Sequence, residues 1–191
     1  MTRLVAAGLR AAGVRVLAKT TGSKPVLILP DGSEREIPRP GPASVREQVR
    51  LVALAARSGA EVLVSEMMSI GPECLAVESR RILRPGTLAL TNVKLDHLDA
   101  MGRRKDDIAR ALASAIPERA DVYVPEEEVH PVFAATASLS GAALHPVPPL
   151  PASGPGVGPA LPFGEHEANV RLALAVLGSL GVDRDAARRG L

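Results

Sequence analysis

Three residues able to bind a metal ion or move a proton lie close together in the segment TNVKLDHLDAMG, residues 91–102. They are Asp96, His97 and Asp99, and they follow residues 87–90, whose apolar side chains predict a buried strand. The ends of strands in α/β proteins are where metals and phosphates tend to bind. On spacing alone, the alternative is a solvated turn, because an Asp-His pair in a loop is more often a cap or turn than a metal ligand.

A second polar residue occupies a matching position. Residues 61–65 (EVLVS) predict another buried strand, and Glu66 follows it directly. If the two strands are neighbours, Glu66 and His97 emerge at the carboxyl edge of one sheet. A carboxylate oxygen and an imidazole nitrogen, completed by water and a substrate phosphate, would make a Mg²⁺ or Mn²⁺ site.

Helical and strand patterns alternate along the chain, which favours a three-layer α/β/α fold with a mostly parallel sheet. An Asp-Gly turn at residues 31–32 predicts a small β-hairpin, residues 25–37, as an excursion from that sheet. The predicted strands are residues 14–18, 61–65, 87–90 and 121–124, and the predicted helices are residues 2–12, 44–58, 73–83, 105–116, 131–139 and 165–180.

Two local signals add detail to this outline. Ser44 and Glu47 have the spacing of a capping box at the start of a helix, with Val49 and Val52 on its apolar side. Residues 145–162 (HPVPPLPASGPGVGPALP) are rich in Pro and Gly and predict a loop or linker. We expect residues 1–191 to form a single domain that is large enough to bury a core.

Composition excludes several classes of protein. With two Phe, one Tyr and no Trp, the chain lacks the stacking platforms that bind single-stranded nucleic acid, and a net charge of +2 is too small for a DNA-binding surface. A single cysteine, Cys74, allows neither an internal disulfide nor a cysteine-based zinc site. No stretch has the roughly 18 apolar residues of a membrane span. We therefore expect a cytoplasmic protein.

Five segments resemble the Mur ligase superfamily of ATP-dependent amide ligases, in order and in spacing: KTTGSKP, PDGSEREI, REQ, SEMMSIGPE and TNVKLDHLDAMG. The DHLD motif after a Thr-Asn pair is characteristic of the superfamily, and the Lys-Thr-Thr-Gly and Glu-Met-Met pieces resemble the ligase subunit of poly-γ-glutamate synthases, which form capsules. The likeness covers residues 2–117, weakens through residues 121–162 and resumes from residue 165. It implies the P-loop NTPase-like central domain of these ligases.

The resemblance also implies an activity and its participants. Such enzymes transfer the γ-phosphoryl group of ATP to a carboxylate, and an amine then attacks the acyl phosphate to form an amide. For this branch the substrates would be glutamate and poly-γ-glutamate, the cofactors ATP with Mg²⁺ or Mn²⁺, and the partners membrane subunits of a capsule synthase. The resemblance implies Glu66 and His97 as metal ligands, Lys19 and Asp96 as catalytic residues, Asn92 and Asn169 as cofactor-binding residues, and Thr20 and Thr21 as substrate-binding residues.

Two of these assignments have a structural alternative of equal simplicity. Lys19 would be a solvated lysine at the end of a strand, and Asn169 an exposed polar position on an amphipathic helix.

The sequence departs from the superfamily at one decisive place. It contains no G-x-x-G-K-[ST] loop, whose backbone N–H groups and Lys hold the ATP phosphates. We therefore expect a chain truncated at its N-terminus, without the phosphate-binding loop and the strand that leads into it, and without appreciable ATP turnover of its own. The alternatives are a non-catalytic remnant that binds a metal or a partner, and another Mur-type ligase of the folylpolyglutamate or muramyl-peptide kind.

Overall fold

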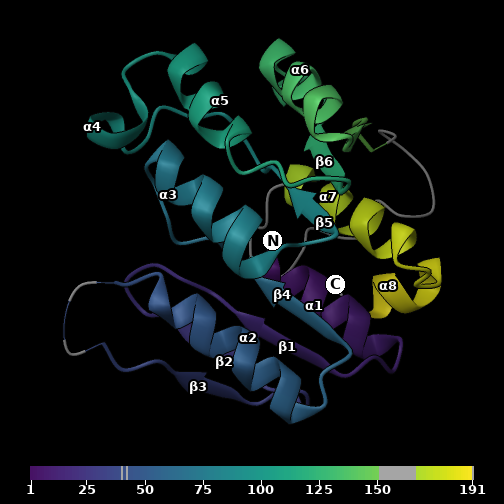
Figure 1. Ribbon diagram of the computed structural model, residues 1–191. Helices are drawn as coiled ribbons and strands as arrows, with labels where there is room; N and C mark the ends of the chain where they lie inside the picture. The colour runs from purple at the N-terminus through teal and green to yellow at the C-terminus, as the bar shows by residue number, and fades with distance from the viewer. Residues whose placement is uncertain (40, 42, 151–166, 191) are drawn as a thin grey trace.

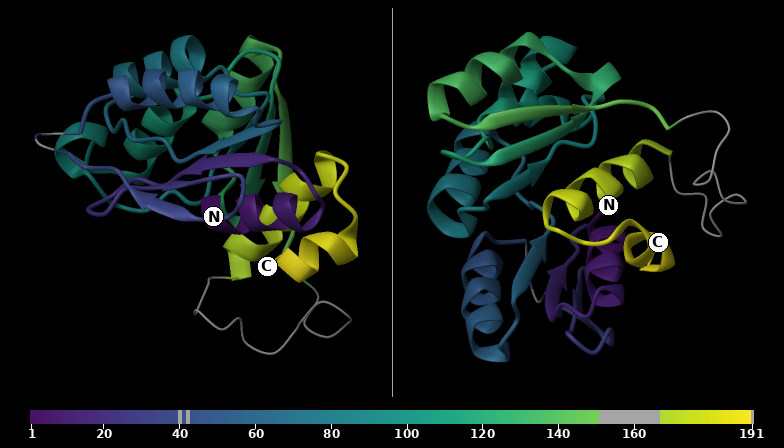
Figure 2. Two further views of the ribbon diagram at one scale, coloured as in Figure 1. Left: turned by 90° about the horizontal axis from the view of Figure 1, so that it is seen from below. Right: turned by 90° about the vertical axis from the view of Figure 1, so that its right-hand side faces the viewer.

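The computed structural model describes residues 1–39, 41, 43–150 and 167–190. Two small β-sheets lie between two layers of helices, so the three-layer α/β/α architecture predicted from the sequence is confirmed (Figures 1 and 2). One helical layer comprises α1 (Thr2–Ala11), α7 (Glu167–Ser179) and α8 (Arg184–Gly190). The opposite layer comprises α2 (Arg46–Ser58), α3 (Pro72–Val77), α5 (Lys105–Ala113) and α6 (Pro131–Ser140).

The first sheet has the strand order β3-β2-β1-β4. Its last two strands, β1 (Val16–Lys19) and β4 (Val62–Ser65), are parallel, with Lys19 beside Ser65. The hairpin formed by β2 (Val26–Ile28) and β3 (Glu34–Glu36) pairs antiparallel with β1. The predicted hairpin therefore exists, but it extends the sheet rather than leaving it.

The second sheet is parallel and has the order β5-β6-β7. Its strands are β5 (Thr87–Ala89), β6 (Asp121–Pro125) and β7 (Ala143–Val147). The prediction of an irregular segment at residues 145–162 is wrong for its first three residues, which belong to β7. Hydrogen bonding to β6 places Pro146 in a strand although its own nitrogen carries no donor. The part of that prediction over residues 151–162 lies outside the described residues.

Helix α2 differs in two ways from the prediction. It begins at Arg46, and Ser44 Oγ accepts from the Arg46 N–H at 3.4 Å, so no capping box forms with Glu47. The helix also buries a different face: Gln48 and Leu51 are buried, whereas 53% of Val49 is exposed. The Glu47 side chain turns away from the helix end toward β1, where it has charged partners.

Short helical elements complete the chain. Helix α3 continues directly into a π-helix, Glu78–Leu83, so the predicted helix over residues 73–83 has a change of winding at Glu78. Helix α4 (Leu98–Met101) and a 3₁₀-helix (Glu126–Glu128) were not predicted, since each spans one turn or less. No helix in the described ranges is long and apolar enough to cross a bilayer.

Two hydrophobic cores hold the layers together. The first packs α1, α7 and α8 against β1, and the second packs α3, α5 and α6 against β5 and β6. Contact between α1 and α8 is close, since a Cβ added at Gly190 would lie 2.6 Å from the carbonyl oxygen of Ala7. Each core thus belongs to one of the two helical layers.

Candidate functional site at the cavity between the two sheets

The edges of the two sheets face each other across a cavity. Strands β4 and β5 are edge strands, and among the described residues no ladder joins them, so the condition that they are neighbours in one sheet is not met. Every residue of both strands lines one cavity of about 810 Å³. In a strand, successive side chains point to opposite faces. Because consecutive residues of β4 and β5 all line the cavity, the unpaired backbone edges of these two strands face it.

Polar residues from four segments gather on this cavity, because Thr20, which follows β1, also lines it. The residues that follow β4 and β5 line it together with the first residues of α1. The polar and charged members of its lining are Thr2, Arg3, Thr20, Ser65, Glu66, Ser69, Thr87, Thr91, Asn92, Lys94, Asp96 and His97.

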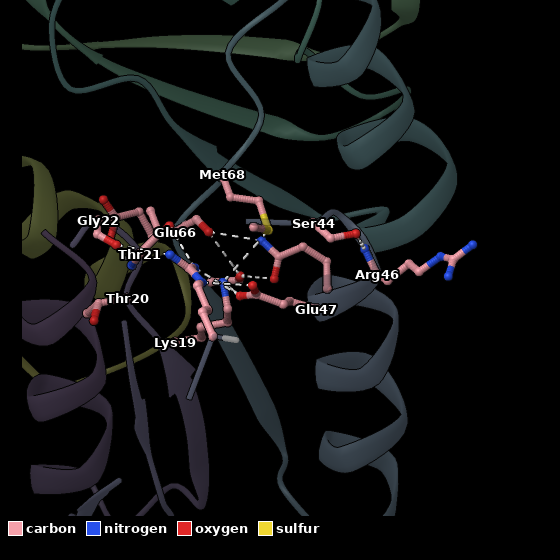
Figure 3. Close-up of polar contacts among 12 residues, drawn as sticks. Lys19, Thr20, Thr21, Gly22, Ser44, Arg46, Glu47, Glu66 and Met68 are labelled. Carbon is pink, nitrogen blue, oxygen red and sulfur yellow. Dashed lines mark hydrogen bonds and ion pairs between the residues drawn. The ribbon is translucent and has the colours of Figure 1, made fainter. Parts of the chain in front are cut away.

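Glu66 is exposed and its backbone and side chain are both held by β1. Its N–H donates to the Lys19 carbonyl at 2.9 Å, which continues the β1–β4 ladder by one residue. Its carboxylate Oε2 accepts from the Thr21 N–H at 2.7 Å (Figure 3). The second carboxylate oxygen has two lone pairs for a cation.

The Asp96-His97 pair directly precedes helix α4, and His97 is the N-cap residue. His97 has φ 49°, in the left-handed region that non-glycine residues seldom adopt. Asp96 Oδ1 accepts from the His97 N–H at 2.7 Å, and Asp96 Oδ2 lies 3.8 Å from His97 Nε2. Both side chains are more than half exposed. This geometry includes the cap-like turn expected as the alternative, and it also brings the imidazole to the cavity.

The structure brings together five of the eight residues expected at the site. Thr20, Glu66, Asn92, Asp96 and His97 all line the cavity, whereas Lys19, Thr21 and Asn169 do not.

Lys19 has surroundings unlike either expectation. Only 1% of its side chain is exposed, so it is not the solvated lysine of the simpler interpretation. Its Nζ lies 3.6 Å from Glu47 Oε2 and 4.0 Å from Met68 Sδ (Figure 3). Burial lowers the pKa of the Lys19 ammonium below its ordinary value, against the opposing effect of Glu47. The buried ammonium points into the protein, toward α2.

Asn169 lies in the first turn of α7, away from the cavity lining, and is half-buried rather than exposed. The structure thus separates it from the residues expected to bind the metal.

The donor set determines what kind of cation could bind. Within the described residues, no three His, Cys, Asp or Glu side chains lie close enough to form a metal site by themselves. Glu66 and His97 supply one carboxylate and one imidazole to a common cavity. Mg²⁺ is commonly held by one or two carboxylates together with water and substrate phosphates. Glu66 and His97 therefore fit a divalent cation whose coordination is completed by a nucleotide and water, and they do not fit a site made of protein ligands alone.

Three residues that support the site escaped the sequence analysis. Gln48 and Glu78 are both fully buried, and Arg39 forms a bidentate ion pair with Glu47 at 2.8 and 2.9 Å. Hydrogen bonding to Arg39 lowers the pKa of the Glu47 carboxyl below its ordinary range. The REQ motif, residues 46–48, was the available signal, but a polar residue on an amphipathic helix gives no indication of burial.

Solved structures share this fold. A bifunctional folylpolyglutamate synthase/dihydrofolate synthase with Mn, AMPPNP and L-glutamate bound superimposes with a TM-score of 0.62 over 98% of this chain and 53% of that protein, at 21% identity. The fold is thus shared with the folylpolyglutamate synthases.

Two curated proteins are related in sequence. PGA synthase CapB of Bacillus subtilis (strain 168) is 30% identical over 135 residues, which are 70% of this chain and 34% of the relative. The capsule biosynthesis protein CapB of Bacillus anthracis is 28% identical over 198 residues, which are 100% of this chain and 41% of the relative. No protein-family model matches. Relatives and fold together show that the chain belongs to the Mur ligase superfamily and is akin to its poly-γ-glutamate synthases; it spans well under half the length of these two relatives.

Proposed function

We propose that this chain forms the core of an ATP-dependent amide ligase that adds glutamate to poly-γ-glutamate. The observation that carries the proposal is the joint presence of Glu66 and His97 on the cavity between β4 and β5. The curated relatives support the substrate, because one is named a PGA synthase and the other a capsule biosynthesis protein. A structural neighbour with AMPPNP, Mn and L-glutamate bound supports the cofactors.

The proposed reaction has two steps. A carboxylate oxygen of the acceptor attacks the γ-phosphorus of ATP, the bond to the bridging oxygen breaks, and ADP leaves. The amine of the incoming glutamate then attacks the acyl carbon, inorganic phosphate leaves, and the amine loses a proton. Phosphorylation is needed because a carboxylate is a poor electrophile, and the enzyme mainly positions reactants and offsets negative charge.

The cavity residues take roles suited to their chemistry. Glu66 and His97 would hold a divalent cation, which when bound neutralises charge on the transferred phosphoryl group. Asp96 would act beside them by fixing the backbone of His97, to whose N–H it is bonded. Asn92 would shape the same pocket with its amide, which lies 3.5 Å from Thr91 Oγ1.

The residues after β1 would face the acceptor. Thr20 reaches the cavity and would bind the acceptor or its phosphate, while Thr21 would act through its hydrogen bond to Glu66. Lys19 would serve as a buried positive charge behind these residues, since its ammonium does not reach the cavity. Asn169 would contact adenine only if the nucleotide extends from the cavity to the first turn of α7.

The open edges of β4 and β5 support a proposal on domain organisation. One further strand between them would join the two sheets and make residues 1–191 part of a single Mur ligase-like central domain. A phosphate-binding loop at the end of that strand would lie beside Glu66. Residues 1–191 contain no such G-x-x-G-K-[ST] motif, so we expect this chain alone to turn over little ATP.

ADP release with glutamate and poly-γ-glutamate tests the ligase proposal. In a protein that includes the phosphate-binding loop, Glu66→Ala and His97→Ala should each lower kcat/KM by on the order of 100-fold or more, because each removes a cation ligand. Asp99→Ala is the control from the same segment, since Asp99 does not line the cavity. Unchanged ligation in both ligand variants would remove the metal-site proposal.

A non-catalytic scaffold is the second candidate, and the lack of a phosphate-binding motif in residues 1–191 favours it. A scaffold should show no thermal shift with Mg-ATP even after a loop is restored, and a folylpolyglutamate-type ligase should release ADP with a folate acceptor instead.

For the ligase we further propose a cytoplasmic location and association with membrane subunits of a capsule synthase; both are properties of the proposed complex. Co-purification with those subunits from membranes would test the association.

A further inference from the structure

Glu66 is held in place from two elements. Besides a hydrogen bond from the adjacent Ser65 hydroxyl, it has three partners farther along the chain, and two of these belong to β1 and its continuation: the Lys19 carbonyl and the Thr21 N–H. The third comes from helix α2, where the Gln48 side-chain Nε2 donates to the Glu66 carbonyl at 3.0 Å. The position of the Glu66 carboxylate therefore depends on the position of helix α2 relative to β4.

Gln48 is one half of a buried pair that fixes the backbone after β4. Its Nε2 also donates to Glu78 Oε1 at 2.7 Å, and its Oε1 accepts from Ser65 Oγ at 3.2 Å. Glu78 in turn accepts from the Met68 N–H at 3.0 Å and the Ser69 N–H at 2.8 Å. The Ser65 hydroxyl, the Glu66 carbonyl and the backbone N–H groups of Met68 and Ser69 are thus tied to two fully buried side chains.

The neighbouring residue, Glu47, fixes the other loop. Its carboxylate pairs with Arg39 and lies 3.6 Å from Lys19 Nζ (Figure 3). The Arg39 guanidinium also donates to the Gly22 carbonyl at 3.0 Å and to Thr21 Oγ1 at 3.4 Å. Consecutive residues of α2 therefore hold the two loops that meet at the hydrogen bond between Thr21 and Glu66.

The orientation of helix α2 buries less apolar surface than its sequence would allow. Helix α2 places Gln48 in the interior while leaving 53% of Val49 and 36% of Val52 exposed. A buried polar side chain contributes little net stability even when fully hydrogen-bonded, and an aliphatic residue at that position would bury more apolar surface. The π-helix that begins at Glu78 is a second irregularity, of a kind found often at functional sites. Departures from local preference of this sort mark sites where geometry matters more than stability.

We propose that Glu47 and Gln48 are positioning residues, which through Arg39 and Glu78 set the place and orientation of the Glu66 carboxylate at the cavity. This inference rests on the proposed function, since it gives Glu66 the role of a cation ligand. Neither residue touches the cavity itself. Outer groups of this kind orient metal ligands, and losing one costs on the order of 10- to 100-fold in metal affinity.

The test compares Gln48→Leu with wild type in the ligase that includes a phosphate-binding loop. Leucine keeps most of the buried volume and removes every hydrogen bond of the amide. Mn²⁺ affinity in the presence of AMPPNP, measured from the EPR signal of free Mn²⁺, should fall by on the order of 10- to 100-fold. Amide exchange at Met68 and Ser69 should quicken by about tenfold, while exchange in β6 stays unchanged.

Leu51→Ala is the matched control on the same helix. Leu51 is buried in α2 but bonds to neither loop, so its loss should lower stability and leave Mn²⁺ affinity unchanged. Wild-type Mn²⁺ affinity in Gln48→Leu, or an equal loss in Leu51→Ala, would overturn the positioning role. If Glu66→Ala binds Mn²⁺ as wild type does, the proposed function itself fails, and that result is distinct from the other two.

Discussion

At the scale of single residues, hydrogen bonds hold the two side chains that we propose as cation ligands. Glu66 has one carboxylate oxygen occupied by the Thr21 N–H, and His97 is turned by a left-handed backbone that Asp96 supports. Lys19 is the residue for which sequence reasoning failed most clearly. Both of its predicted roles assumed that a polar residue after a strand reaches solvent or substrate, whereas Glu47 offers it a partner inside the protein.

The Glu47–Arg39 pair predicts a pH dependence of stability. The pKa of Glu47 is lower in the folded chain than its ordinary value, chiefly through its hydrogen bond to Arg39, so the unfolded chain binds more protons in that range. The stabilisation is present above the ordinary pKa of a glutamate, about 4.5. It is lost as the pH falls through the lower folded value.

Urea unfolding at a series of pH values from about 3 to 6 measures this effect. Glu47→Gln should flatten the pH dependence, and Arg39→Gln should do the same because Arg39 is its main cause. A wild-type slope that persists in both variants would contradict the assignment.

At the scale of elements, most helices and strands could be predicted from apolar periodicity, and their exceptions have physical causes. Strand β7 was missed because His145 and Pro146 interrupt its pattern, yet the strand is half-exposed beside β6 and tolerates them. The buried face of α2 was misjudged because its valines are exposed and a glutamine is buried. Periodicity reports where apolar residues lie and carries no information on a buried hydrogen-bond network.

Because α1 packs closely against α8, adding one methyl group at Gly190 should lower stability considerably. A Cβ at Gly190 would meet Ala7 backbone atoms at 2.6 Å, which cannot be relieved by turning a side chain. Gly190→Ala should therefore lower the free energy of unfolding by about 1–3 kcal/mol. Chemical denaturation would measure it.

Gly178→Ala on α7 is the control for this substitution. No atom lies within 4 Å of a Cβ there, and alanine favours a helix over glycine, so stability should hold or rise slightly. Equal loss in both variants would show that the contact between α1 and α8 is not the cause.

At the scale of the whole molecule, the two sheets are separated by the cavity that carries the site. The fold class and the superfamily could be recognised from the motifs, and five of the eight expected site residues line one cavity. Strand pairing could not be derived in the same way, because apolar periodicity locates β4 and β5 but does not show that they belong to separate sheets. The separation of β4 from β5 is the physical reason.

The separation of the two sheets leads to a prediction about nucleotide binding. Residues 1–191 alone should show no thermal shift with Mg-ATP, because their sequence contains no G-x-x-G-K-[ST] loop to bind the phosphates. A version extended by an apolar strand and a G-x-x-G-K-[ST] loop should gain thermal stability without nucleotide and a further increase with Mg-ATP. A shift of equal size in residues 1–191 would contradict the proposed role of the strand and loop.

The central claim is that Glu66 and His97 hold the same cation. Pulsed EPR of Mn²⁺ bound with AMPPNP to the loop-complete ligase tests it most directly, with histidine labelled by ¹⁵N. We predict a hyperfine coupling from one histidine nitrogen that disappears in His97→Ala and persists in His130→Ala. Bound Mn²⁺ without any histidine coupling, or a coupling that survives the loss of His97, would contradict the claim.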